Sequence, residues 1–140
     1  MTVSTTSISK STSGNGSATS FPYDYKILEA TDLQVIIRSA TGAETIKATS
    51  TYTVTGVGAD SGTIVFNSSN VPASGETVVV TRNVLQTQAI DYIANDPFPA
   101  ETHEEGLDRA TMVIQQVSGD ADRSIKISKT NTMTSTEFTV

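Results

Sequence analysis

The sequence predicts a mainly β protein: a small antiparallel β-sandwich or barrel, then one α-helix, then short strands that begin a shaft or collar. Two observations carry this prediction. Short runs rich in Val, Ile, Thr and aromatic residues alternate with turn residues between positions 20 and 82, a pattern typical of antiparallel sheets. The run from Phe98 to Val117 is instead dense in Glu, Leu, Met, Ile and Gln, residues that favour a helix.

The strands follow one another in order. Phe21, Tyr23 and Tyr25 alternate as one face of a strand does, and Tyr52 and Val54 are predicted to face inward in the same way. Gly42 supplies the positive φ of a hairpin turn. Residues 77–82 (TVVVTR) are apolar enough for a central strand. The remaining strands are expected at residues 32–39, 44–48 and 63–66.

Four segments are predicted along the chain. Residues 1–19 form a flexible N-terminal arm, since they are almost all Ser, Thr, Gly and other small residues. Residues 20–97 form the sandwich and end in an irregular crossing segment from residue 83. Residues 98–118 form the helix, which Ser118 and Gly119 are expected to end. Residues 119–140 begin the shaft or collar, with strands at 123–129 and 136–140.

The composition excludes several classes of function. The 140 residues carry a net charge of −6, and the basic residues are scattered singly, so nucleic acid is not an expected partner. No segment has the roughly 20 apolar residues of a membrane helix, and the N-terminus has no apolar signal region. Only 36% of the residues are hydrophobic, which is a small supply for a core. Several chains that share one core would resolve this shortage.

No catalytic, metal or cofactor site is expected. The chain has no Cys and one His, His103, so thiolate zinc sites and paired imidazoles cannot form. Glu104 and Glu105 are adjacent and point to different sides of the helix. The glycine-rich loop at residues 56–62 is not followed by a Lys or a clear helix, which argues against phosphate binding. The protein is not expected to be an enzyme.

The helix carries a heptad-spaced seam. The spacing of four, three, four and three residues is that of a helix–helix contact, and the seam residues are His103, Leu107, Ala110, Ile114 and Val117. Met112 and Val113 lie away from the seam. One interpretation is that one face meets the chain's own sheet and the seam meets the same helix of a symmetry mate. Periodicity alone fits equally a simple amphipathic helix packed on a sheet.

A resemblance to a known family bears on this choice. The segments TSFPYDYKILEATDLQVII, TYTVTG, GTIVF, VPASGETVVVTR and TQAIDYIANDPFPAETHEEGLDRATMVIQQV closely resemble the N-terminal virion-attachment domain of podovirus (T7-like) phage tail fibres and tailspikes. The similarity runs from about Ser20 to Lys129. The chain departs from the family at Gly106 and Ala110, where members usually carry larger aliphatic residues or alanine.

The resemblance implies a structural virion protein of the phage tail, made in the host cytoplasm, that supports host attachment. It implies a homotrimer joined at the helix seam and anchored to tail tube, adaptor or nozzle proteins. Docking to the tail is expected from the N-terminal arm, whose Thr and Val residues suit an added edge strand. The residues concerned are Thr2, Val3, Ser4, Thr5, Thr6, Ser7 and Ile8.

Two alternatives stay open from the sequence. The chain is either part of a longer fibre or a short adaptor that carries a separate receptor-binding protein. A different class, the β-sandwich stalk module of a bacterial surface adhesin, also has a Thr-rich composition. The missing signal sequence and the missing internal repeat argue against that class.

Overall fold

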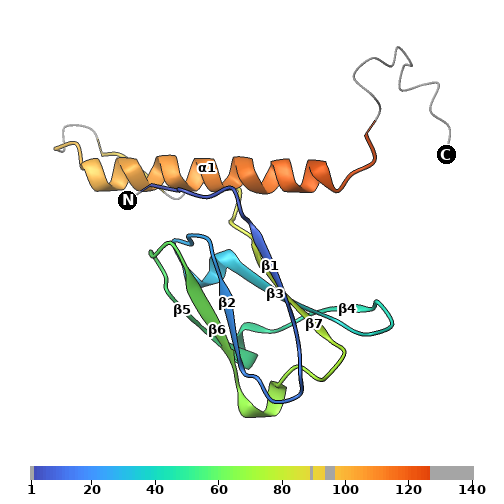
Figure 1. The fold of residues 1–140 in the computed structure, drawn as a ribbon. Helices are drawn as coiled ribbons and strands as arrows, with labels where there is room; N and C mark the ends of the chain where they lie inside the picture. The colour runs from blue at the N-terminus through green and yellow to red at the C-terminus, as the bar shows by residue number, and fades with distance from the viewer. Residues whose placement is uncertain (1, 89, 94–96, 127–140) are drawn as a thin grey trace.

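The computed structural model describes residues 2–88, 90–93 and 97–126. It confirms the predicted class: two antiparallel sheets packed as a sandwich, with one long helix lying crosswise over one end of it (Figure 1). In the described part of the chain the sheets stay separate and close no barrel. The helix and the N-terminal segment lie side by side along that end (Figure 1).

The larger sheet has four strands in the order β1-β7-β3-β4: β1 (Ser9–Ser13), β7 (Thr77–Arg82), β3 (Leu33–Arg38) and β4 (Glu44–Ile46). The smaller sheet has the order β2-β6-β5: β2 (Ser20–Tyr23), β6 (Gly62–Phe66) and β5 (Tyr52–Thr55). All pairings are antiparallel. The central position predicted for residues 77–82 is confirmed, because β7 lies between β1 and β3. Three short 3₁₀ turns complete this region: η1 (Ala30–Asp32), η2 (Thr49–Thr51) and η3 (Ser68–Asn70).

The core lies between the sheets and follows the predicted alternation. Phe21, Tyr23 and Tyr25 are all buried, and Phe21 meets Phe66 of β6 edge-on at 5.6 Å between ring centroids. Tyr52 is buried and Val54 packs against the same cluster. The phenol of Tyr23 donates to the Thr55 carbonyl at 2.6 Å, and burial raises its pKa to about 12.

The β3–β4 hairpin forms as expected at Gly42. This residue has φ of 91°, a conformation that glycine adopts without strain. Its N–H donates to the Ser39 carbonyl at 2.9 Å. The hairpin therefore turns where the sequence predicts.

The N-terminal segment differs from the expected boundary at residue 20. Residues 9–13, predicted as part of the arm, form β1 and pair with β7 from Ser9↔Thr81 to Ser13↔Thr77. Four of the five β1 residues are exposed, so no alternation of apolar residues marks the strand in the sequence. Backbone pairing with the open edge of β7 stabilises it.

The helix α1 runs over Ala100–Asp122, which corrects the predicted C-terminal end. It starts directly after Pro99 and continues four residues beyond Ser118. Gly119 does not end it, although a helical Gly costs about 1 kcal/mol relative to Ala. A Cβ at Gly119 would lie 2.3 Å from Cδ1 of Ile8, so the glycine makes room for the N-terminal segment. The strands expected after the helix fall mostly on residues 127–140, outside the described residues. The part that is described, residues 123–126, contains no strand.

Candidate interface helix

Helix α1 turns a polar face toward the sandwich. Its buried residues are Asp108, Arg109, Met112 and Gln116, and the half-buried Gln115 lies beside them. Met112 is fully buried but lies outside the hydrophobic core between the sheets. We call Asp108, Arg109, Gln115 and Gln116 the polar face. The helix is therefore fixed to the sandwich chiefly by hydrogen bonds and ion pairs.

The first of these contacts is a buried ion pair. The Lys26 ammonium lies 2.5 Å from Oδ2 of Asp108, and the two side chains are 6% and 7% exposed. Oδ1 of the same carboxylate accepts from the backbone N–H of Val3 at 3.1 Å. Asp108 thus joins three segments: the helix, the loop after β2 and the N-terminal segment.

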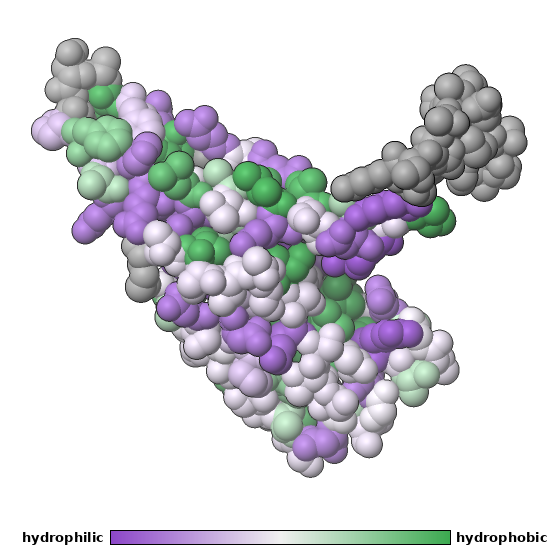
Figure 2. Space-filling view, turned by 45° about the horizontal axis from the view of Figure 1, so that its top comes forward, coloured by the Kyte–Doolittle hydropathy of each residue, from purple (hydrophilic) through white to green (hydrophobic). Residues whose placement is uncertain are grey.

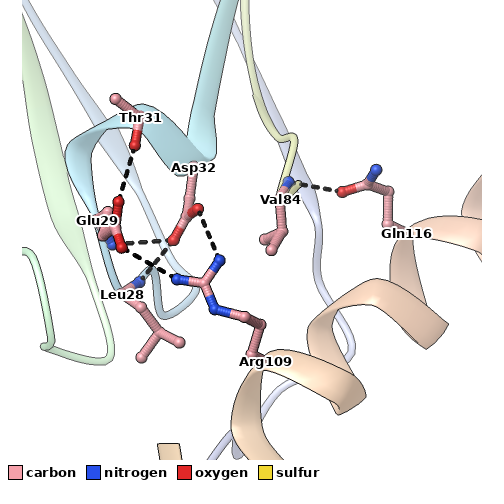
Figure 3. A network of polar contacts seen from close by, with 7 residues as sticks. All are labelled: Leu28, Glu29, Thr31, Asp32, Val84, Arg109 and Gln116. Carbon is pink, nitrogen blue, oxygen red and sulfur yellow. Dashed lines mark hydrogen bonds and ion pairs between the residues drawn. The ribbon is translucent and has the colours of Figure 1, made fainter. Parts of the chain in front are cut away.

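Arg109 reaches the 3₁₀ turn η1 (Figure 3). Its Nη2 lies 3.1 Å from Oε1 of Glu29, and its Nη1 lies 4.0 Å from Oδ1 of Asp32. Asp32 is held in turn, since its Oδ2 accepts from the backbone N–H groups of Leu28 and Glu29 at 3.1 and 2.9 Å. The turn therefore presents a preformed pair of carboxylates to the helix.

The two adjacent glutamines complete the polar face. Gln116 accepts from the Val84 N–H at 2.8 Å (Figure 3), and Gln115 donates to the Thr5 carbonyl at 2.9 Å. Gln115 also accepts from the guanidinium of Arg82, a fully buried residue that lies 5.8 Å from the Tyr25 ring centroid. Burial lowers the pKa of Arg82. The glutamine pair thus bonds the crossing segment, the N-terminal segment and the end of β7.

The predicted seam lies on the opposite side of the helix. Ile114 follows Met112 by two residues, about 200° around a helix of 3.6 residues per turn. Leu107, Ile114 and Val117 are 58%, 68% and 51% exposed. Figure 2 shows hydrophobic side chains recurring along the helix. The structure brings the seam residues together on one face, and the described part of the chain leaves Leu107, Ile114 and Val117 on it more than half exposed. The predicted contact with a second copy stays a prediction.

His103, the first seam residue, belongs to an aromatic cluster. Its ring centroid lies 4.9 Å from that of Phe98 and 6.5 Å from that of Tyr92. Tyr92 and Phe98 are themselves stacked at 5.9 Å, and the Tyr92 hydroxyl is 3.4 Å from Nδ1 of His103. The imidazole thus packs against two aromatic rings at the start of the helix.

The crossing segment runs back along the helix. Val84 contacts Gln116, Ile90 lies by Gly106 and Tyr92 lies by His103. A Cβ at Gly106 would be 3.2 Å from Cδ1 of Ile90, which is a tight approach. The absence of a side chain at Gly106 therefore lets this segment lie close to the helix.

The seven arm residues named as docking candidates lie along the helix. Val3 bonds Asp108, Thr5 bonds Gln115, and Ile8 reaches Gly119. The five steps from Val3 to Ile8 span roughly 16 Å in an extended chain, as do the eleven steps from residue 108 to residue 119 of the helix at about 1.5 Å each. The segment from Val3 to Ile8 is thus an extended strip parallel to the helix. Thr2, Ser4 and Thr6 face solvent, and a role in docking stays a prediction.

The polar face is the part of the site that the sequence prediction missed. The sequence does carry a signal for this face. Opposite the seam, one apolar residue, Met112, is surrounded by the polar residues Asp108, Arg109, Gln115 and Gln116. A face of this composition cannot serve as the apolar stripe of an ordinary amphipathic helix. Which acceptors and donors it meets depends on Lys26, Glu29 and Asp32, far away in the sequence.

Among the described residues, no three His, Asp or Glu side chains are grouped so as to hold a metal ion. None of the helical residues described makes a stretch long and apolar enough to span a bilayer.

Comparison with known proteins connects this architecture to a phage component. No protein-family model matches the chain. A tail spike protein of Salmonella phage epsilon15 is 40% identical over 120 residues, which cover 84% of this chain. The match covers 11% of that tail spike protein, so the chain spans about one ninth of its relative's length. The described residues form a mainly β fold with one helix, and the chain is a domain related to podovirus tail fibres and tail spikes, proteins of the phage virion tail.

Proposed function

We propose that this chain trimerises through the seam of α1 and anchors a receptor-binding fibre or spike to the phage tail. The orientation of the helix carries the proposal. Its polar face is bonded to the sandwich, whereas Leu107, Ile114 and Val117 are more than half exposed. An ordinary helix on a sheet has the opposite arrangement, so a partner for the seam is expected.

The energetics favour association. Full burial of a Leu, Ile or Val side chain contributes about 1.5–3 kcal/mol, and these three are a little over half exposed. Covering them stabilises each chain by roughly 2–5 kcal/mol before the entropic cost of association. The number of three copies rests on the resemblance to tail fibres and tailspikes.

The N-terminal segment is the proposed attachment surface. Alternate residues hold it to the helix, which leaves Thr2, Ser4 and Thr6 facing solvent. An extended strip of this kind offers backbone donors and acceptors to the sheet edge of another protein. Its expected partners are tail tube, adaptor or nozzle proteins of the virion, and the fibre or a separate receptor-binding protein is carried beyond the helix.

Light scattering of the 140-residue chain at micromolar concentration tests the trimer. The variant Ile114→Asp places a charge in the seam, where desolvation without a partner costs several kcal/mol; we expect it to be monomeric. Thr111→Asp is the matched control, because Thr111 is exposed on the polar flank of the same helix. A monomeric unmodified chain, or an Ile114→Asp chain that stays trimeric, would refute the seam.

A further inference from the structure

An apolar groove follows one flank of the seam. It lies between the crossing segment and the helix, has a volume of about 550 Å³, and is lined in part by Ile90, Tyr92, Gly106, Ala110, Val113 and Ile114. We call it the side groove. Gly106 and Ala110 carry little or no side chain, so this flank is hollow where the neighbouring residues of the seam protrude.

The opposite flank of the seam is different. Successive residues are about 100° apart around the helix, which places Glu104, Thr111 and Ser118 on that side. Thr111 and Ser118 are exposed, and all three are polar. The helix therefore presents an apolar ridge, Leu107 and Ile114, with an apolar groove on one flank only.

The groove and the ridge are free of negative charge. The chain carries 15 Asp and Glu residues and a net charge of −6, so two copies repel each other overall. None of the residues that line the side groove is acidic, and none of the seam residues is. On the helix, the acidic side chains from Glu101 to Asp122 all lie outside these two surfaces. The side groove and the ridge themselves therefore bring no carboxylate into a contact between copies, although the exposed Asp91 lies beside the groove in the crossing segment.

Three apolar residues of the crossing segment are also exposed. Leu85 and Ile93 are 71% and 72% exposed, and Tyr92 is 44% exposed. These side chains extend the apolar surface beyond the helix. A contact made by the helix seams alone would leave them in water.

We propose that the side groove receives the ridge of a second copy of this chain. Leu107 and Ile114 of one copy then lie between the helix and the crossing segment of the next. Such a contact joins two different surfaces, and a heterologous contact closes into a ring when its rotation allows. This inference rests on the proposed trimer and adds to it: the crossing segment, with Ile90 and Tyr92, forms half of each interface.

Disulfide trapping tests this arrangement, since the chain has no Cys. Chains carrying Leu107→Cys are mixed and refolded with differently tagged chains carrying Thr87→Cys, since Thr87 is an exposed residue that lines the side groove. Each chain then has a single thiol, so every link is between copies. Mild oxidation is expected to link Leu107→Cys to Thr87→Cys in most trimers.

The control pairs Thr111→Cys with Thr87→Cys, because Thr111 lies on the polar flank; we expect at least tenfold less of that link. Trimers that give only links between two Leu107→Cys chains, or equal yields with Thr111→Cys, would overturn the side-groove contact and leave the trimer standing. Monomers in light scattering would overturn both proposals.

Discussion

Asp108 shows how one residue orients the helix. Its carboxylate bonds the Lys26 ammonium on one side and the Val3 N–H on the other, all at low exposure. The Coulomb attraction of a buried pair is largely offset by the cost of removing both charges from water. The pair therefore fixes the orientation of helix α1 on the sandwich more than it adds to the net stability of the fold.

Removal of that carboxylate should be costly. Asp108→Ala removes the carboxylate that pairs with the buried Lys26 ammonium. Breaking a buried ion pair costs about 3–5 kcal/mol. We expect the free energy of unfolding, measured by urea titration, to fall by that amount. Asp120→Ala is the control, because its pair with Arg123 is more than 60% exposed and such pairs contribute about 0–1 kcal/mol. Equal losses in the two variants would contradict a special role for Asp108.

At the scale of elements, helix α1 and the N-terminal segment form a unit. Gly119 lets Ile8 approach the helix, and the Ile8 carbonyl accepts from the Arg82 N–H at 2.8 Å. The position of the segment thus depends on the absence of a side chain at one helical residue.

Gly119→Leu should loosen the N-terminal segment. The new side chain overlaps Ile8, and overpacking costs typically about 1–3 kcal/mol, although the helix itself gains intrinsic propensity. Amide hydrogen exchange of residues 3–8 should accelerate by roughly tenfold, since about 1.4 kcal/mol corresponds to that factor. Ser118→Leu, exposed one residue earlier, adds the same side chain with a smaller propensity gain and should leave exchange unchanged. Unchanged exchange in Gly119→Leu would show that Ile8 does not hold the segment.

At the scale of the whole molecule, the sandwich and the helix have separate tasks. The hydrophobic core is built from strand residues and their neighbours alone, and the helix adds Met112 outside it. The sandwich is a scaffold that holds one helix with its apolar face outward and one extended strip beside it. Both proposed contacts, with other copies and with the tail, lie at the end of the sandwich that the helix covers (Figure 1).

Deletion of residues 2–7 separates these two contacts. It removes the exposed Thr2, Ser4 and Thr6 together with Val3 and Thr5, which bond the helix. It keeps Ile8, β1 and the ion pairs of Asp108 and Arg109 with the sandwich, so the trimer should still form. Incorporation into phage particles should fall at least tenfold, as measured by immunoblotting of purified virions from a phage that carries the deletion. The triple variant Thr2→Ala, Ser4→Ala, Thr6→Ala is the comparison, since backbone pairing would survive it. Normal incorporation of the deleted chain would place tail docking elsewhere.

The sequence by itself determined the strands between residues 20 and 82, the hairpin turn at Gly42, the central place of β7 and the presence of one helix. Each of these leaves a local signal: apolar residues alternate on a half-buried strand, and glycine marks positive φ. The five seam residues share one helix face, as their heptad spacing predicts; their contact with another copy stays a prediction.

Tertiary structure alone decided three further features. The strand β1 has no apolar pattern because both its faces are exposed, and pairing with β7 forms it. The helix continues through Gly119 because Ile8 needs the space. The polar face meets the sandwich because Lys26, Glu29 and Asp32 offer partners there, contacts between residues about 80 positions apart that no local pattern records.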